Sequence, residues 1–380
     1  MNSFGLYIHW PFCIKKCPYC DFNSYSIEYD EESWVLNLIK ELEFACQEFP
    51  DYFMKTIFFG GGTPSLIEPT NIGKLIKKAK SLWKHGDLEI TLETNPSSIE
   101  TKSLEEFMEN GINRFSIGMQ SLNDEKLQFL GRLHSASEAK QILTHASSIC
   151  GNVSGDFIYS LPNDSLEVWK KDLDEIVELA LKINLKHISL YQLTIEENTA
   201  FEKQVAQKKW IPLENDLQGD LYEHTSKIMD QIGWDFYEVS NVSRGTSFRS
   251  KHNLIYWNYE NYLGIGPGAH SRMEKEGQKI KFHNIKNPYK WLEKNINFSN
   301  TKEDHEVVDE KNQFLEKLLM GLRLKDGINF KQSDWQYINQ FALENLEMEG
   351  FLKFENSNNI KLTKKGMLRL NAILGFIVKG

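Results

Sequence analysis

The residues best suited to chemistry are three cysteines near the start of the chain, which lie within a span of eight residues: Cys13, Cys17 and Cys20. This spacing allows three thiolates to converge on one metal centre from a single loop. Zinc sites usually combine two closely spaced pairs of ligands, which this loop lacks. An iron–sulfur cluster fits better, and because such clusters normally take four cysteines, one iron would stay open to a small molecule. The alternative is that all three are ordinary buried thiols.

The residues around the cysteines resemble a known family. A Cys-x3-Cys-x2-Cys motif after a predicted strand is similar to the signature of the radical S-adenosylmethionine (SAM) superfamily, and the preceding segment Tyr7–Cys13 reads YIHWPFC. That segment resembles the branch that contains oxygen-independent coproporphyrinogen III dehydrogenase and the heme chaperone HemW. The dehydrogenase has a further cysteine two residues after the third one, whereas this chain has Phe22. The departure points to the chaperone.

Composition limits the possible classes of protein. A chain of 380 residues with 41% hydrophobic residues is long enough for a barrel-sized domain and a smaller one. Its formal charge of -9 argues against broad attraction to nucleic acid or anionic lipid. The sequence has no signal peptide and no apolar run of membrane-spanning length, so we expect a cytoplasmic protein without a transmembrane segment. Cys46 and Cys150 provide no disulfide framework.

Short β-rich runs, each followed by residues with helical periodicity, recur through the first half of the chain. This is the pattern of βα units in a parallel sheet, and six units predict an α/β fold with a partial, TIM-like (β/α)6 barrel. Ligands of parallel sheets bind at the carboxyl ends of the strands, so the residues there are candidates for the site. The predicted strands are Leu6–Trp10, Thr56–Phe59, Leu88–Glu93, Arg114–Gly118, Gly155–Tyr159 and His187–Leu193.

Two segments that follow predicted strands carry candidate cofactor contacts. The segment Gly60–Ser65 contains three consecutive glycines, which leave backbone groups free to approach a ligand closely, although tight turns also need glycine. The resemblance assigns Gly61, Gly62 and Thr63 to the loop that grips the amino group of SAM. Glu93 ends the third strand, where the resemblance implies hydrogen bonds from the ribose or the amino group. The alternative for Glu93 is a solvated loop carboxylate.

Later strands supply further polar candidates. Gln120 offers a donor and an acceptor to a ribose, and the planar fork of Arg132 suits a carboxylate such as that of methionine. Both match family positions, although Arg132 also fits an exposed helix arginine. By resemblance, Asp156 is an acidic ribose contact, Thr194 lies near the adenine, and Tyr7 belongs to the same SAM site.

Two segments after the predicted barrel are less regular. Asn241–Trp257 is rich in Ser, Arg and Asn with little helical period, and it contains His252 within the sequence HNLIYW. A neutral imidazole is a good axial ligand for heme iron, but a lone histidine near aromatic residues is more often structural. The pattern His-Asn-x-x-Tyr-Trp is associated with HemW proteins, so we keep His252 as a heme-binding hypothesis. In the glycine-rich loop Gly264–Ser271, the resemblance implies SAM contacts from Ala269 and His270.

The C-terminal part predicts a small helical domain. Glu303–Glu310 is acidic and aperiodic, which is typical of a linker. A helix over Trp335–Glu349 and a hairpin from Phe351–Phe354 and Ile360–Thr363 predict a winged-helix-like fold. Residues 306–380 carry 11 basic and 10 acidic residues, which is too little net positive charge for a surface that binds the phosphate backbone of a nucleic acid. The predicted domains are residues 1–240, the radical SAM barrel; residues 241–302, an extension; and residues 303–380, the winged-helix-like domain.

Three functions compete. In the first, implied by the resemblance to HemW, the protein carries a 4Fe-4S cluster with SAM, binds heme and delivers it to heme-requiring respiratory membrane proteins, with possible homodimerisation. In the second, it is a coproporphyrinogen III dehydrogenase that oxidatively decarboxylates propionate side chains by radical chemistry. In the third, it is a redox-sensing regulator that binds DNA. A pure sensor has no need of the SAM loops, and Phe22 counts against the dehydrogenase.

Overall fold

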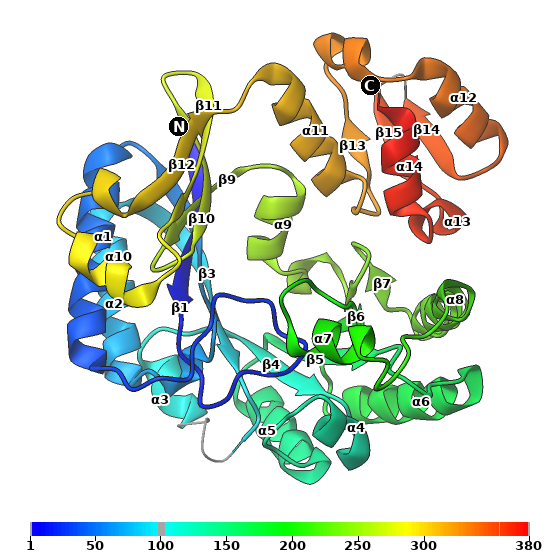
Figure 1. Cartoon of the computed structure of the whole chain (residues 1–380), viewed down its shortest axis with the longest axis horizontal. Helices are drawn as coiled ribbons and strands as arrows, with labels where there is room; N and C mark the ends of the chain where they lie inside the picture. The colour runs from blue at the N-terminus through cyan, green and yellow to red at the C-terminus, as the bar shows by residue number, and fades with distance from the viewer. Residues whose placement is uncertain (1, 98–102, 357, 379–380) are drawn as a thin grey trace.

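The computed structural model describes residues 2–97, 103–356 and 358–378. Its centre is a 12-stranded sheet with the order β12-β11-β10-β9-β1-β2-β3-β4-β5-β6-β8-β7 (Figure 1). This order does not return on itself, so the sheet forms an open, partial barrel. Its six central strands are parallel and confirm the predicted ones: β1 (Ser3–Trp10), β2 (Phe53–Gly61), β3 (Lys84–Thr94), β4 (Arg114–Gln120), β5 (Val153–Tyr159) and β6 (His187–Gln192).

Helices cover the outer face of these strands and connect them in sequence (Figure 1). Several begin at a side chain that accepts a hydrogen bond from the first turn, as Asp30 does for α1 and Ser165 for α6. No helix within the described ranges is long and apolar enough to cross a membrane. The helices of this part are α1 (Glu31–Glu48), α2 (Pro69–Leu82), α3 (Leu104–Glu109), α4 (Asp124–Phe129), α5 (Ala136–Ile149), α6 (Leu166–Lys182), α7 (Ala200–Ala206) and α8 (Asn215–Gln231).

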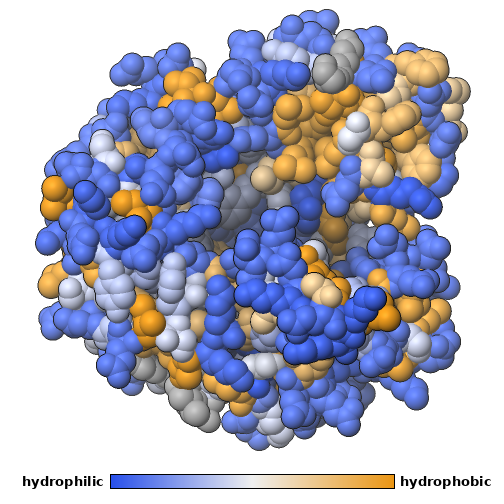
Figure 2. All heavy atoms as spheres, viewed as in Figure 1, coloured by the Kyte–Doolittle hydropathy of each residue, from blue (hydrophilic) through white to orange (hydrophobic). Residues whose placement is uncertain are grey.

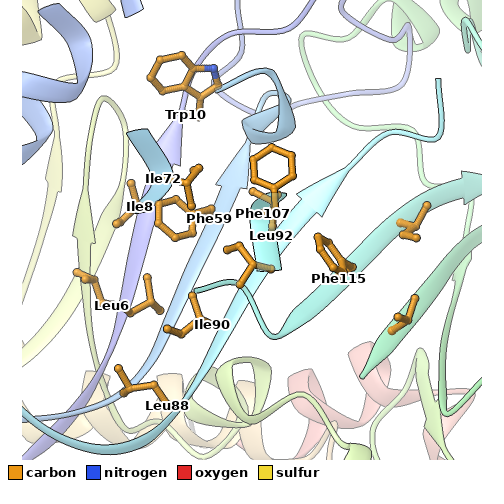
Figure 3. Packing of buried hydrophobic residues seen from close by; sticks show 14 of the residues in the cluster. Leu6, Ile8, Trp10, Phe59, Ile72, Leu88, Ile90, Leu92, Phe107 and Phe115 are labelled. Carbon is orange, nitrogen blue, oxygen red and sulfur yellow. The ribbon is translucent and has the colours of Figure 1, made fainter. Parts of the chain in front are cut away.

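Alternation along each strand separates an apolar outer face from a polar interior. On β1, Leu6, Ile8 and Trp10 are fully buried and lie within the main hydrophobic cluster, close to Ile72 of α2 (Figure 3). Tyr7, between them, points to the opposite face. Burial of the outer face drives the packing of the helices, while the inner face keeps room and polar groups for a ligand.

The sheet continues past the predicted barrel on both sides. Next to β6 lie β8 (Asn241–Ser243) and the two-residue strand β7 (Asp235–Phe236). Next to β1 lies the parallel strand β9, followed by three antiparallel strands. Their bounds are β9 (Asn261–Ile265), β10 (His270–Lys275), β11 (Gln278–Asn284) and β12 (Lys302–Val307).

The prediction of a linker at Glu303–Glu310 is wrong. Residues Lys302–Val307 form the edge strand β12 instead, paired with β11. The acidic side chains of this strand are exposed, which suits an edge strand because charge discourages pairing with another chain. Asp309 then caps α11 (Glu310–Gly321) by accepting a hydrogen bond from the backbone of Asn312.

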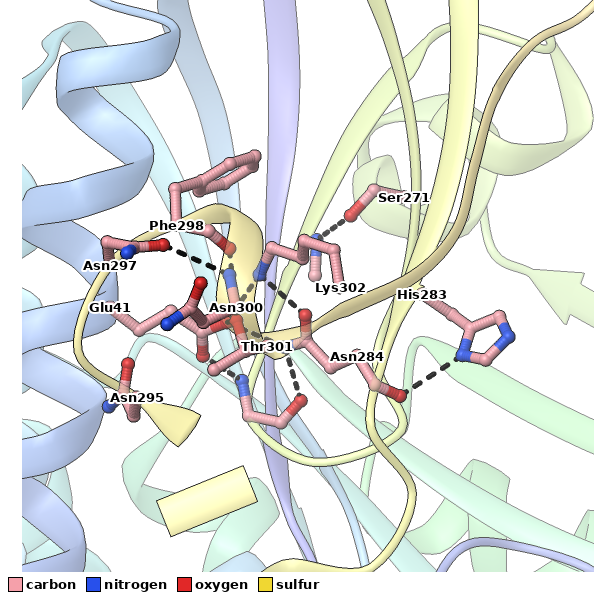
Figure 4. A network of polar contacts seen from close by, with 12 residues as sticks. Glu41, Ser271, His283, Asn284, Asn295, Asn297, Phe298, Asn300, Thr301 and Lys302 are labelled. Atoms are coloured by element: carbon pink, nitrogen blue, oxygen red, sulfur yellow. Dashed lines mark hydrogen bonds and ion pairs between the residues drawn. The ribbon is translucent and has the colours of Figure 1, made fainter. Parts of the chain in front are cut away.

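A buried ion pair fastens β12 to α1. The ammonium of Lys302 lies 2.5 Å from the Glu41 carboxylate, and both side chains are almost completely shielded from solvent (Figure 4). Asn284 donates to the same carboxylate at 2.8 Å, and the backbone N–H of Gly266 donates to it at 2.7 Å. One carboxylate therefore connects a helix, two strands and the glycine-rich loop.

The C-terminal part has its own hydrophobic cluster, which runs from Phe314 to Ile377. The helix predicted at Trp335–Glu349 is confirmed over α12 (Gln340–Met348), whose N-cap is Asn339, but its first residues belong to a separate 3-10 helix over Gln332–Tyr337. A three-stranded antiparallel sheet and short helices complete a winged-helix-like arrangement, and hydrophobic residues gather over this part in Figure 2. The remaining elements are β13 (Ile328–Asn329), β14 (Leu352–Asn356), β15 (Asn359–Leu362), α13 (Lys364–Met367) and α14 (Leu370–Ile377).

We predict that Lys302→Met lowers the free energy of unfolding by about 3 to 5 kcal/mol, because it leaves the Glu41 carboxylate buried without its cation. Urea unfolding followed by circular dichroism measures the change. Lys281→Met is the matched control, since Lys281 pairs with Glu306 at the surface and its loss should cost less than about 1 kcal/mol. Equal effects of the two substitutions would contradict the role of the buried pair.

Candidate functional site

The three cysteines lie on the loop between β1 and α1 and line one cavity of about 470 Å³. The loop is held by its own backbone: Cys13 N–H donates to Tyr25 at 3.0 Å, and Cys20 N–H donates to Cys17 at 3.1 Å. All three side chains are partly exposed. The thiols are therefore reachable from the cavity without rearrangement of the fold.

The three thiols line the same cavity, as ligands of one shared cluster would. Among the described residues, no three His, Cys, Asp or Glu side chains are placed to hold one metal ion. A 4Fe-4S cluster instead takes one thiolate at each of several separate irons. Burial raises the pKa of Cys13 to about 11 and also raises the pKa of Cys20, so cluster binding at neutral pH must displace protons from these thiols.

The glycine loop lies against the cysteine loop with no space for a side chain. Gly62 N–H donates to Trp10 and Thr63 N–H donates to Phe12, both at 2.7 Å. A Cβ on Gly62 would lie 2.4 Å from the carbonyl oxygen of Phe12, which is far inside van der Waals contact. Gly61 has a φ of 114°, which residues with a Cβ rarely adopt. The glycines are thus required by close backbone packing as well as by any ligand.

Glu93 lies at the carboxyl end of β3, beside this loop. Its carboxylate accepts a hydrogen bond from Gly61 N–H at 3.2 Å. Burial raises the pKa of Glu93 to about 7, with the nearby Asp156 adding to the shift and the Gly61 bond opposing it. A carboxyl group near half-ionisation at neutral pH responds strongly to a ligand that donates hydrogen bonds or carries positive charge.

Asp156, on β5, is held by three hydroxyl groups that the sequence analysis did not identify. The hydroxyls lie on the inner faces of β4, β5 and β6, and the alternation of side chains along those strands is the signal that would have found them. Each hydroxyl donates a hydrogen bond to the Asp156 carboxylate, with oxygen–oxygen distances of 2.6 to 2.7 Å; the three residues are Ser116, Ser154 and Ser189. This network orients Asp156 toward the same cavity as the cysteines.

Arg132 and Gln120 complete the side of the cavity near the cysteines. The Arg132 guanidinium donates to the carbonyl of Gly118 at 3.1 Å, and it lies 3.5 Å from the sulfur of Cys17. Arg132 is therefore a half-buried residue beside the cysteine loop rather than an exposed helix arginine. Gln120 has a φ of 62°, an unusual conformation at the end of β4 that redirects the chain into the following loop. Thr194 lies at the exposed rim.

A second cavity of about 720 Å³ adjoins the first. It contains the predicted residues that the first cavity lacks: Tyr7, His252, Ala269 and His270. Gly61, Glu93 and Phe22 line both cavities, so the two spaces meet at these residues. Figure 2 shows the surface hollowed near the middle of this face.

His252 lies on a helix, not in an irregular segment. The helix is α9 (Lys251–Trp257), which the sequence analysis missed although Ser250 provides an N-cap. The His252 ring is stacked on Phe58, and both of its nitrogens have partners: Thr56 Oγ1 at 2.6 Å and the Tyr256 hydroxyl at 2.8 Å. Burial lowers the pKa of His252 to about 3, so the imidazole is neutral, as a metal ligand must be.

The structure thus brings the predicted residues to one end of the barrel, divided between two adjoining cavities. Their individual roles stay predictions. The partial barrel and the three-cysteine loop are the features of one class of protein, and residues 7–180 match the sequence profile of the Radical SAM superfamily.

Relatives narrow this class. The chain is 34% identical over 383 residues to the heme chaperone HemW of Haemophilus influenzae, covering 97% of this chain and 96% of that protein. It is 34% identical to the mitochondrial radical S-adenosyl methionine domain-containing protein 1 of Danio rerio, covering 98% and 86%. The chain therefore belongs to the HemW family of the radical SAM superfamily.

A solved structure shares the whole fold. Coproporphyrinogen III oxidase from Escherichia coli, described as a radical SAM enzyme, aligns with a TM-score of 0.80 at 20% identity and covers 98% of this chain and 89% of its own. At this identity the likeness concerns the fold alone. It agrees with the partial barrel described above.

We predict that Gly62→Ala displaces the cysteine loop from the glycine loop, because the added Cβ would collide with the backbone at Phe12. Iron and sulfide content after anaerobic reconstitution should fall severalfold, and the melting temperature should drop. Gly151→Ala is the matched control, because no atom of the residues that the structure describes lies within 4 Å of a Cβ at that glycine. Full cluster loading of Gly62→Ala would show that the two loops can separate.

Proposed function

We propose that this protein is a heme chaperone, which binds heme and delivers it to heme-requiring respiratory membrane proteins. The observation that carries the proposal is Phe22, which is 55% exposed and lines both cavities at the position where the dehydrogenase has a further cysteine. An exposed aromatic ring there offers apolar surface to a porphyrin face instead of a ligand to iron. The similarity to proteins named heme chaperones over nearly the whole chain supports the same function.

The proposal includes a 4Fe-4S cluster on Cys13, Cys17 and Cys20, together with SAM. When bound, the cluster supplies an open iron at which SAM can coordinate. The protein positions this cofactor through the glycine loop and through side chains that ring the two cavities. The proposed SAM contacts are Tyr7, Gly61, Gly62, Thr63, Glu93, Gln120, Arg132, Asp156, Thr194, Ala269 and His270.

We also propose that heme contacts His252 in the second cavity. Direct ligation of iron by the outer ring nitrogen requires the hydroxyl of Tyr256 to move away, since that hydroxyl now lies 2.8 Å from the nitrogen. Phe58, Tyr256 and Tyr262 supply aromatic surface around the histidine. A neutral ring that exchanges one hydrogen bond for a metal bond keeps its other nitrogen anchored on Thr56.

The second candidate is coproporphyrinogen III dehydrogenase activity. It is favoured by the complete set of SAM-site candidates around the two cavities, which a protein that only carried heme would not need. In this case the SAM residues and the exclusion of water from the cavity would serve radical chemistry.

The test is anaerobic reconstitution of the cluster, followed by parallel assays of heme retention and of coproporphyrinogen III conversion with SAM and a reductant. We expect stable heme binding without product, loss of the cluster absorbance in Cys17→Ala, and weaker heme binding with an intact cluster in His252→Ala. His145→Ala, at an exposed histidine paired with Glu105, is the control. Product formation with only loose heme binding would assign the protein to the dehydrogenases.

The raised pKa of Glu93 predicts how SAM binding depends on pH. Below its pKa of about 7 the group is protonated and accepts hydrogen bonds from SAM poorly, whereas above it the carboxylate accepts them well. The affinity for SAM should therefore rise about tenfold between pH 6 and pH 8, measured by isothermal titration of the reconstituted protein. Glu93→Gln should bind more weakly and lose this rise. A rise that persists in the variant would assign the titration to another group.

A further inference from the structure

Arg114 is a buried cation without a partner. It begins β4, its side chain is on the inner face of the barrel, and it is only 2% exposed. Its Nε atom has no hydrogen-bond partner, and within the described part of the chain the guanidinium forms no ion pair. The side chain nevertheless lines the first cavity. Burying a guanidinium costs several kcal/mol unless an anion or hydrogen-bond acceptors compensate it.

The nearby carboxylates form no hydrogen bond or ion pair with Arg114 within the described residues, and they accept hydrogen bonds from neutral donors instead. Asp156 takes its hydrogen bonds from three serine hydroxyls. Glu89 accepts from the backbone N–H groups of Lys251 and His252, at 3.2 and 3.0 Å. Glu93 accepts from a backbone N–H group, and its raised pKa leaves it only partly ionised at neutral pH. Glu93 and Arg114 attract each other, which opposes the rise in the Glu93 pKa, but no hydrogen bond or ion pair joins Arg114 to a carboxylate of the described residues.

A second polar group beside Arg114 also lacks a partner. Thr91 on β3 is the direct neighbour of Arg114 in the strand register, and its hydroxyl is buried without a hydrogen bond. Native proteins rarely leave adjacent buried donors unused, so two of them in one layer of the barrel indicate a missing acceptor. Arg114 lies two residues before Ser116 on the same face, about 7 Å deeper than the Asp156 network at 3.3 Å per residue.

We propose that Arg114, at the floor of the first cavity, and the adjacent Thr91 form an anion subsite, which receives a carboxylate carried on a short arm of the bound ligand. A guanidinium presents a planar fork of N–H donors that matches a carboxylate in two parallel hydrogen bonds. The depth of the subsite requires a narrow arm, because the serine network lies above it. This inference rests on the proposed heme function, in which a propionate of the tetrapyrrole supplies the carboxylate.

The test compares heme with heme dimethyl ester, in which both carboxylates are blocked, by absorbance titration of the reconstituted protein in the presence of SAM. The wild-type protein should bind heme at least about tenfold more tightly than the ester, the size expected for a charge-assisted hydrogen bond. In Arg114→Gln this preference should fall by about tenfold, with unchanged affinity for the ester. Arg114→Lys, which keeps the charge without the fork, should recover part of it.

The melting temperature distinguishes whether Arg114 binds a ligand or only supports the fold. Apo Arg114→Gln should melt no lower than the wild-type protein, because the substitution removes an uncompensated buried charge. Arg272→Gln is the control: it breaks a two-bond pair with Glu316, at 2.9 Å each, outside both cavities, so it should lower the melting temperature and leave the preference for heme unchanged.

Two results would overturn the inference while the proposed function stands. One is an unchanged preference for heme over its ester in Arg114→Gln. The other is an equal loss of affinity for both ligands together with a melting temperature as low as that of Arg272→Gln, which would make Arg114 a structural residue. If the wild-type protein binds neither ligand, the proposed function fails and this inference fails with it.

Discussion

The site depends on the close contact between two loops at the carboxyl ends of β1 and β2. Parallel pairing places Trp10 opposite Gly61, and two backbone hydrogen bonds of 2.7 Å then join the cysteine loop to the glycine loop. Only residues without a Cβ permit this approach at Gly62. Because the contact is made by backbone atoms, it fixes the cysteines relative to Glu93 more firmly than side-chain packing would.

Burial of polar groups inside the barrel gives the site its chemical character. The outer faces of the strands take up the apolar residues, so charged side chains such as Glu93, Asp156 and Arg114 lie on the inner face, around the first cavity. In such surroundings unpaired charges are costly and pKa values move, as the value of about 7 for Glu93 shows. The buried ion pair of Glu41 and Lys302 also helps to hold the site, because Glu41 accepts a hydrogen bond from the glycine-rich loop at Gly266.

Much of the fold was predictable because it follows from local patterns. The six central strands and the C-terminal hairpin of β14 and β15 appear where periodicity places them. The errors concern segments whose structure depends on distant partners. The acidic residues of β12 form a strand because β11 offers an edge. The segment around α9 becomes helical where it packs against β2 and β9. An aperiodic sequence carries no sign of such pairing.

For the site, the sequence by itself determined the three cysteines, the glycine loop and the family, since these features depend on residue type and spacing within short segments. The tertiary structure alone decided that the candidates divide between two cavities meeting at Phe22, that both nitrogens of His252 are engaged, and that Arg114 has no ion-pair partner among the described residues. The reason is physical: hydrogen-bond satisfaction and burial are properties of groups brought together from distant strands, and no single segment contains them.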